Sequence, residues 1–212
     1  MKKVTSTKKN SRIAAVDLEP ALIAAAKKLL HEGGPGALSV RAIAAEAGVA
    51  PMGVYNRFAN KNGVVDALFI DGFVLFNGAL RGAKFPIGTE KNVVKAYLEA
   101  TDRMGIAYRC FATENPSLYE LMFMKSVADY VPSEVAMLSA RAALTTLIER
   151  VEWGQRAKIL LAGDSEEISQ RVWAACHGAA ALEIAGIGPV VDRERHFRKV
   201  VATLYRGLLR AP

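Results

Sequence analysis

The side chains with the clearest chemical pattern lie between Ser39 and Lys61. Asparagine can pair with a base edge, whereas arginine, lysine, serine and tyrosine side chains can reach the phosphate backbone of a duplex. The candidate DNA-contacting residues are Ser39, Arg41, Ala50, Pro51, Met52, Gly53, Tyr55, Asn56, Arg57 and Lys61. Gly53 either lets the backbone approach DNA closely or fits a tight crossing of two helices.

Two short helices joined by a glycine-containing turn must position these side chains. Ser39 is a good N-cap for a helix that ends before Gly48, and a second helix is expected over about 50–58. Val54 and Phe58 lie one turn apart and face inward, so the other side chains of the second helix face outward. This is the helix-turn-helix pattern, whose second helix enters the major groove. Alone it is not specific, because short amphipathic helices also meet in unrelated helical proteins.

The positive charge of the chain is concentrated near its N-terminus. The net charge is +7, and residues 1–62 hold ten Lys and Arg against four acids, whereas residues 63–212 hold 18 against 17. A polyanion is the expected partner of the first third, and both nucleic acid and an acidic membrane fit this pattern. Residues 1–14 form a basic arm that either follows DNA or is a solvated, flexible end. Its cations are Lys2, Lys3, Lys8, Lys9 and Arg12.

The remainder of the chain is predicted to be helical as well. Strand alternation is almost missing, while Ala-rich and Leu-rich stretches recur with helical spacing. Helices are expected over about 20–31, 40–47, 50–58 and 61–81, then through 93–111, from 116, through 133–151, and over 164–185 and 192–209. We therefore predict an all-α fold of about nine helices, with a DNA-binding domain over 15–62 and a larger domain over 63–212.

A small-molecule cavity is the expected feature of the larger domain. Trp173 and His177 are four residues apart and so share a helix face. The candidate ligand-binding residues are Tyr108, Phe111, Tyr119, Met122, Phe123, Trp173 and His177. This lining favours an apolar or aromatic effector, although aromatic and Met stripes at helical spacing also serve as ordinary core packing.

The last two predicted helices carry the pattern of a dimer interface. Ala174, Gly178, Ala181 and Ala185 make a stripe of small residues that permits close approach by another helix. Beside it the last helix offers a bulkier stripe of Phe197, Val200, Val201, Leu204 and Leu208. Two copies related by a two-fold axis would form a four-helix bundle. A monomer that buries both stripes internally is the alternative.

The helix-turn-helix residues resemble those of the TetR (tetracycline repressor) family of bacterial transcription regulators. The resemblance covers about residues 15–70 and rests on Ser39-Val40-Arg41, Ile43-Ala44, Ala47-Gly48-Val49, Gly53-Val54-Tyr55, Phe58 and Lys61. It implies a dimeric regulator, most often a repressor, that leaves a palindromic operator when a small molecule binds. The family more often has Ser where Ala50 stands, and an aromatic or His at Asn56 and Arg57, which leaves the operator sequence open.

A fainter resemblance extends into the larger domain. The segments 115–123 and 173–178 are similar to those of the TetR subgroup whose C-terminal domain is named for a Trp and a His-Gly pair, here Trp173, His177 and Gly178. The resemblance implies that this domain senses a ligand and forms the dimer.

Other function classes find little support. Two cysteines and three histidines cannot build a disulfide framework or a zinc pattern, so no metal and no cofactor is expected. A small helical enzyme is the alternative function, but no phosphate loop or nucleophile elbow is present, and Cys176 and His177 face different sides of their helix. A membrane-surface adaptor lacks a basic face, and neither a span of ~20 apolar residues nor a secretory signal is recognisable. We expect a cytoplasmic protein.

Overall fold

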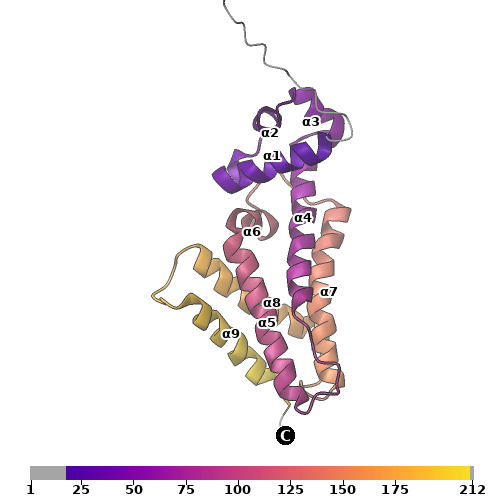
Figure 1. Cartoon of the computed structure of the whole chain (residues 1–212), viewed down its shortest axis with the longest axis vertical. Helices are drawn as coiled ribbons and strands as arrows, with labels where there is room; N and C mark the ends of the chain where they lie inside the picture. The colour runs from indigo at the N-terminus through magenta and orange to yellow at the C-terminus, as the bar shows by residue number, and fades with distance from the viewer. Residues whose placement is uncertain (1–17, 211–212) are drawn as a thin grey trace, which may run out of the picture. The chain divides into compact units, whose positions relative to one another are not determined.

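The computed structural model describes residues 18–210, which form nine α-helices, one short 3-10 helix and no strand (Figure 1). The helices are α1 (Leu18–Gly33), η1 (Pro35–Ala37), α2 (Val40–Glu46), α3 (Pro51–Phe58), α4 (Lys61–Gly82), α5 (Val93–Glu114), α6 (Pro116–Phe123), α7 (Glu134–Arg156), α8 (Ser165–Ile184) and α9 (Arg193–Leu208). The predicted all-α fold is confirmed. The 3-10 turn was not predicted, because Gly34-Pro35-Gly36 indicates only the end of the preceding helix. The basic residues Lys2 to Arg12 lie outside the described part of the chain.

The chain forms two compact units that divide between Leu68 and Phe69, inside α4. The boundary expected from the sequence, between residues 62 and 63, falls in the first turn of the same helix. In the N-terminal unit α1, α2 and α3 pack on one another. Leu22, Ile43 and Val54 are completely buried there and form the centre of the core.

Local capping explains where the helices of the N-terminal unit begin and end. The Ser39 hydroxyl accepts a hydrogen bond from the backbone N–H of Ala42 at 3.2 Å, which caps α2. Gly48 has a φ of 69°, a conformation that favours glycine, and it ends the α2 segment. Pro51 opens α3 in the first turn, where its missing N–H costs no hydrogen bond.

The C-terminal unit is built around α5, which packs against α8 and α9, while α7 packs against α8. Ser133 and Asp164 cap α7 and α8, and Asp164 Oδ1 accepts from the N–H groups of Glu166 and Glu167 at 2.8 and 3.2 Å. Asn115 occupies the N-cap position of α6 without capping it through its side chain. Its Nδ2 instead donates to the carbonyl of Phe111 at 3.0 Å, on the preceding helix.

Helix α4 is unusually apolar. Among the described residues it is the one helix whose length and composition would allow it to cross a membrane, whereas no apolar stretch of that length was recognised in the sequence. In the structure 44% of this apolar stretch is buried inside the protein, as in the core helices of many folds. Its buried residues include Val64, Phe69, Phe73 and Phe76.

Two glycines of the C-terminal unit give a matched test of its packing. A Cβ at Gly154 would lie 2.8 Å from Tyr97 Cζ and 2.9 Å from Leu160 Cγ, whereas a Cβ at Gly78 would meet nothing within 4 Å. Gly154→Ala should destabilise the fold by about 1–3 kcal/mol through overpacking. Gly78→Ala should stabilise it by about 0.5–1 kcal/mol, because alanine favours a helix interior. Thermal or urea unfolding measures both changes, and similar stabilities for the two variants would contradict the packing described here.

Candidate nucleic-acid interface and ligand cavity

Helix α3 presents two sharply different faces within the N-terminal unit. Val54 is completely buried, whereas Met52 and Tyr55 are 63% and 49% exposed. The burial of Val54 in the core therefore determines which side chains of α3 face outward.

Most of the predicted DNA-contacting residues lie at the surface. The exposed ones are Ser39, Arg41, Ala50, Pro51, Met52, Tyr55, Asn56 and Arg57, and the half-buried ones are Gly53 and Lys61. A Cβ at Gly53 would lie 3.5 Å from Val49 Cγ2, which is ordinary contact. The crossing of the helices therefore does not demand glycine at position 53.

An ion pair that the sequence did not reveal restrains one of these side chains. The guanidinium of Arg57 donates to the carboxylate of Glu19 on α1. A second surface pair joins Lys28 to Glu46, on α1 and α2, at 2.7 Å. Because Glu19 is 38 residues from Arg57, no local spacing rule signals this pairing. The pair holds one nitrogen of the Arg57 guanidinium, whose other N–H groups can still donate to a phosphate.

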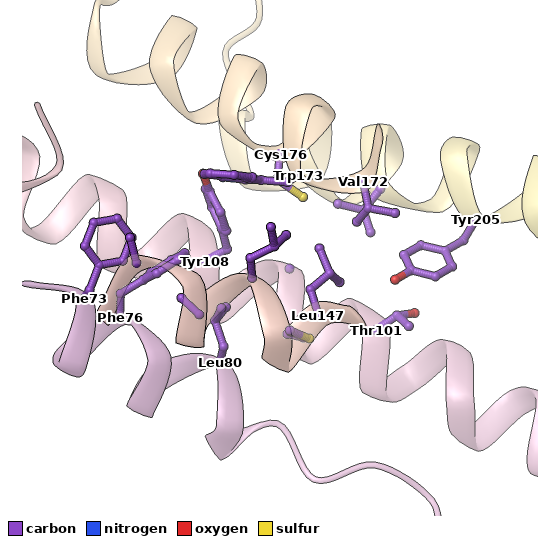
Figure 2. Close-up of a pocket in the computed structure, with 16 residues that line it drawn as sticks. Phe73, Phe76, Leu80, Thr101, Tyr108, Leu147, Val172, Trp173, Cys176 and Tyr205 are labelled. Atoms are coloured by element: carbon purple, nitrogen blue, oxygen red, sulfur yellow. The ribbon is translucent and has the colours of Figure 1, made fainter. Parts of the chain in front are cut away.

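A narrow cavity lies inside the C-terminal unit (Figure 2). Its volume is about 50 Å³ when measured as the space open to the centre of a water molecule, room for a few waters. Helices α4, α5, α7, α8 and α9 all contribute to its wall. The lining residues are Phe73, Phe76, Leu80, Thr101, Met104, Gly105, Tyr108, Ala140, Ala143, Leu144, Leu147, Val172, Trp173, Cys176, Val201 and Tyr205.

Two of the seven predicted ligand-binding residues, Tyr108 and Trp173, line this cavity. The other five, Phe111, Tyr119, Met122, Phe123 and His177, are not among its lining residues. Several of them form an aromatic cluster beside it: Phe123 meets Trp173 at 5.9 Å and His177 at 5.5 Å between ring centroids. The contributions of α4, α7 and α9 were missed, because the apolar faces of these helices look like any core face in the sequence.

A chain of hydrogen bonds connects the cavity wall to α6 and α8. The hydroxyl groups of Tyr108 and Tyr119 are 2.8 Å apart, and the Tyr119 hydroxyl lies 2.6 Å from His177 Nδ1. Burial raises the pKa of both tyrosines above the ordinary value and lowers the pKa of His177. All three groups are therefore neutral near physiological pH.

The two cysteines differ in environment. Cys176 lines the cavity and is buried, and burial raises the pKa of its thiol to about 12. Cys110 is only half-buried. Within residues 18–210, no group of three His, Cys, Asp or Glu side chains gathers as a metal site requires.

The predicted dimer stripe on α8 remains uncovered within the chain. Ala174 and Ala185 are exposed, and Gly178 and Ala181 are half-buried. The predicted stripe on α9 is divided instead. Phe197, Val201 and Leu208 are buried in the chain's own core, where Val201 meets Gly105 of α5, whereas Val200 and Leu204 stay half-buried. Three of the five residues assigned to an intermolecular stripe thus hold α9 to its own subunit.

Comparison with known proteins agrees with these features. Residues 22–68 match the model described as "Bacterial regulatory proteins, tetR family", and residues 102–204 match "Tetracyclin repressor-like, C-terminal domain". No curated protein matches the chain.

Solved structures share the fold at low sequence identity. A protein of unknown function from Rhodococcus sp. RHA1 is 24% identical, with a TM-score of 0.79, and the match covers 96% of this chain and 100% of that one. PfmR, a TetR family transcriptional regulator from Thermus thermophilus, is 19% identical, with a TM-score of 0.62 over 89% and 99%. SmeT, the repressor of the Stenotrophomonas maltophilia multidrug efflux pump SmeDEF, is 18% identical, with a TM-score of 0.63 over 96% and 93%.

The described residues combine an exposed helix-turn-helix with a helical unit that contains a cavity, which is the arrangement expected of a transcription regulator that senses a small molecule. The chain belongs to the TetR family, as the matches at both of its ends show. The subgroup inferred from Trp173, His177 and Gly178 is not distinguished by the description of the matching C-terminal model and stays a prediction.

The lowered pKa of His177 has a consequence for stability. Below pH 6.5, the ordinary pKa of histidine, His177 binds a proton in the unfolded chain but not in the folded chain. The contribution of neutral His177 to the free energy of unfolding is therefore full above that pH, and it is lost as the pH falls through the lower folded-state pKa. His177→Gln should therefore lose less thermal stability than the wild type between about pH 8 and about pH 5. The exposed His196, changed in the same way, serves as the control. Parallel pH profiles for His177→Gln and the wild type would contradict this account.

Proposed function

We propose that this TetR-family regulator is a cytoplasmic repressor that binds a palindromic operator as a dimer and leaves it when a small apolar or aromatic molecule enters the cavity. The observation that carries the DNA half of the proposal is the exposure of Met52 and Tyr55 on the side of α3 opposite the buried Val54. Dimer half-sites one turn of DNA apart place two recognition helices roughly 34–36 Å from each other.

In this proposal α3 reads the bases and its surroundings hold the backbone. Asn56 pairs with a base edge, and Tyr55, Arg57 and Lys61 contact phosphates. Ser39 keeps a hydroxyl hydrogen for a phosphate while its oxygen caps α2. Packing within the chain does not require glycine at position 53, because a Cβ there would make only ordinary contacts. In this proposal Gly53 instead allows the sugar-phosphate backbone to approach closely. Arg41, Ala50, Pro51 and Met52 complete the surface.

The dimer of the proposal forms through α8 and α9. The uncovered small side chains Ala174, Gly178, Ala181 and Ala185 let two copies of α8 approach closely. Because the bulky face of α9 is largely used within the subunit, the α9 contribution comes from its half-buried Val200 and Leu204.

The proposal includes no catalysis. Cys176 is the nucleophile candidate that faces the cavity, and its thiol, with a pKa raised to about 12, stays protonated near neutral pH. A small helical enzyme therefore gains no support from the wall of the cavity.

A band-shift titration with the upstream intergenic DNA of the chain's own gene tests the proposal at two salt concentrations. Retardation that survives competitor DNA is expected of a specific regulator, together with a fall in affinity as salt rises. Binding that is indifferent to sequence and vanishes with salt would refute it.

Tyr55→Ala and Lys61→Ala should each weaken operator binding by about 5–100-fold, because each removes a contact to the duplex. Both variants should remain dimers by size-exclusion chromatography with light scattering. Lys91→Ala, which removes one exposed positive charge from the C-terminal unit, is the matched control and should bind the operator almost normally. Loss of dimerisation in Tyr55→Ala or Lys61→Ala would show that the assignment of roles to the two units is wrong.

Glu19→Gln should strengthen operator binding by about 2–10-fold, because it frees Arg57 from its carboxylate partner and removes a negative charge that repels DNA. The exposed Glu32, on the same helix, gives the control for the general effect of one charge. Glu32→Gln should change the affinity less. Equal gains in the two variants would mean that the pairing of Arg57 does not limit its contact with DNA.

A further inference from the structure

The composition of the cavity wall narrows the class of effector. We propose that the effector is a neutral, compact ring compound with a hydrogen-bond acceptor that binds the indole N–H of Trp173, and that carboxylic acids are excluded. This inference rests on the proposed function, since it names the ligand of the same cavity and assigns Trp173 as the residue that determines specificity.

The cavity wall offers nothing to balance a charge. None of the sixteen lining residues carries a Lys, Arg, His, Asp or Glu side chain. An ionised carboxylate in such a site would lose its water without gaining a cation or several donors, which is strongly unfavourable. The wall therefore selects neutral molecules.

Trp173, which lines the cavity, carries a buried hydrogen-bonding atom without a partner. Its Nε1 atom is buried and has no hydrogen-bond partner. Burial raises the pKa of Tyr108, and the nearby indole of Trp173 lowers it by a smaller amount. The indole N–H nevertheless does not meet the geometry of a hydrogen bond to the Tyr108 hydroxyl. A buried donor without a partner is costly, so a ligand that brings an acceptor gains more than a ligand that brings only apolar surface.

Among the lining residues, Trp173 carries the polar side-chain atom that is both buried and without a hydrogen-bond partner. The Tyr108 hydroxyl is paired with Tyr119, and Thr101 Oγ1 donates to the carbonyl of Leu98 at 2.8 Å. In Figure 2 Trp173 and Tyr108 stand at one end of the space, Thr101 and Tyr205 stand at the other, and Leu147 lies between them. In the proposed complex a flat ring system lies in this aliphatic middle with its acceptor directed toward Trp173, and the wall opens beyond its present volume of about 50 Å³ to admit it.

The chemistry at Cys176 favours reversible binding. A thiol with a pKa of about 12 is not a nucleophile at neutral pH, so capture of an electrophile is not the expected mode of sensing. The ligand is held by apolar contact and one hydrogen bond.

Three two-ring probes of similar shape test the proposal on the full-length protein. Naphthalene has no acceptor, quinoline has one neutral acceptor, and 2-naphthoate is an anion; isothermal titration calorimetry gives the affinity of each. Quinoline should bind at least about 100-fold more tightly than 2-naphthoate. In Trp173→Phe the ratio of quinoline to naphthalene affinity should fall about 3–10-fold, because only quinoline loses a hydrogen bond. Trp153→Phe, which alters an indole stacked on Tyr97 outside the cavity wall, should leave the ratio unchanged.

A measurement on Trp153→Phe keeps the test valid if Trp173→Phe does not fold. That variant has one indole N–H, that of Trp173, and its proton resonance should move downfield with quinoline but not with naphthalene. The proposal is overturned if 2-naphthoate binds as well as quinoline, if the ratio is insensitive to Trp173→Phe, if the resonance does not move, or if no probe binds. A band shift on the same preparation separates the two ideas: specific operator binding without the expected probe binding leaves the regulator standing and removes this inference.

Discussion

The insertion of Val54 into the core of the N-terminal unit is the constraint on which the DNA-reading surface depends. Successive residues of a helix are turned by about 100°, so fixing one side chain inward decides the direction of all the others on a helix of eight residues. Met52, Tyr55 and Asn56 face outward because Val54 cannot. The capped start of α2 and the glycine at position 48 serve the same end, since they set the short turn from which α3 departs. The interface is thus positioned by apolar packing, while its chemistry is supplied by side chains that contribute little to the fold.

In the C-terminal unit the candidate functional surface is the wall of the cavity, which faces the interior of the unit. The cavity lies where aromatic and branched side chains from five helices meet without filling the space completely. The Tyr108–Tyr119–His177 chain holds α5, α6 and α8 in register beside this space. Close contact continues from α6 to α4 of the same unit, where a Cβ at Gly72 would lie 2.6 Å from Met122 Sδ. A ligand that displaces Tyr108 would therefore disturb packing on three other helices, and this gives a physical basis for coupling between occupancy and conformation.

Local signals in the sequence were sufficient to predict most helix boundaries and the outward residues of α3, because caps, glycine turns and periodicity act over a few residues. They were insufficient where the deciding contact is distant. The pairing of Glu19 with Arg57 and the entry of Phe73 and Leu147 into the cavity wall depend on tertiary packing. Dependence on tertiary packing also explains why some predicted ligand-binding residues do not line the cavity. Tyr119 and His177 share the aromatic character of a ligand site, but they satisfy each other through a hydrogen bond instead of facing the space. For α9, amphipathicity identified an apolar face without indicating whether the chain itself or a second copy covers it.

The contrast between the two units bears on how one molecule would recognise both a polyanion and the small neutral compound proposed above. In residues 1–62 cations outnumber acids by ten to four, so long-range attraction brings DNA to a surface whose polar groups remain hydrated. The cavity has no charged side chain in its wall, so the affinity of a ligand there would depend on shape, on the removal of water and on the unpaired indole N–H of Trp173. Salt weakens the first kind of binding strongly and the second hardly at all. A regulator built in this way can respond to a neutral effector at any ionic strength that still permits operator binding, because the two recognition events draw on different physical forces.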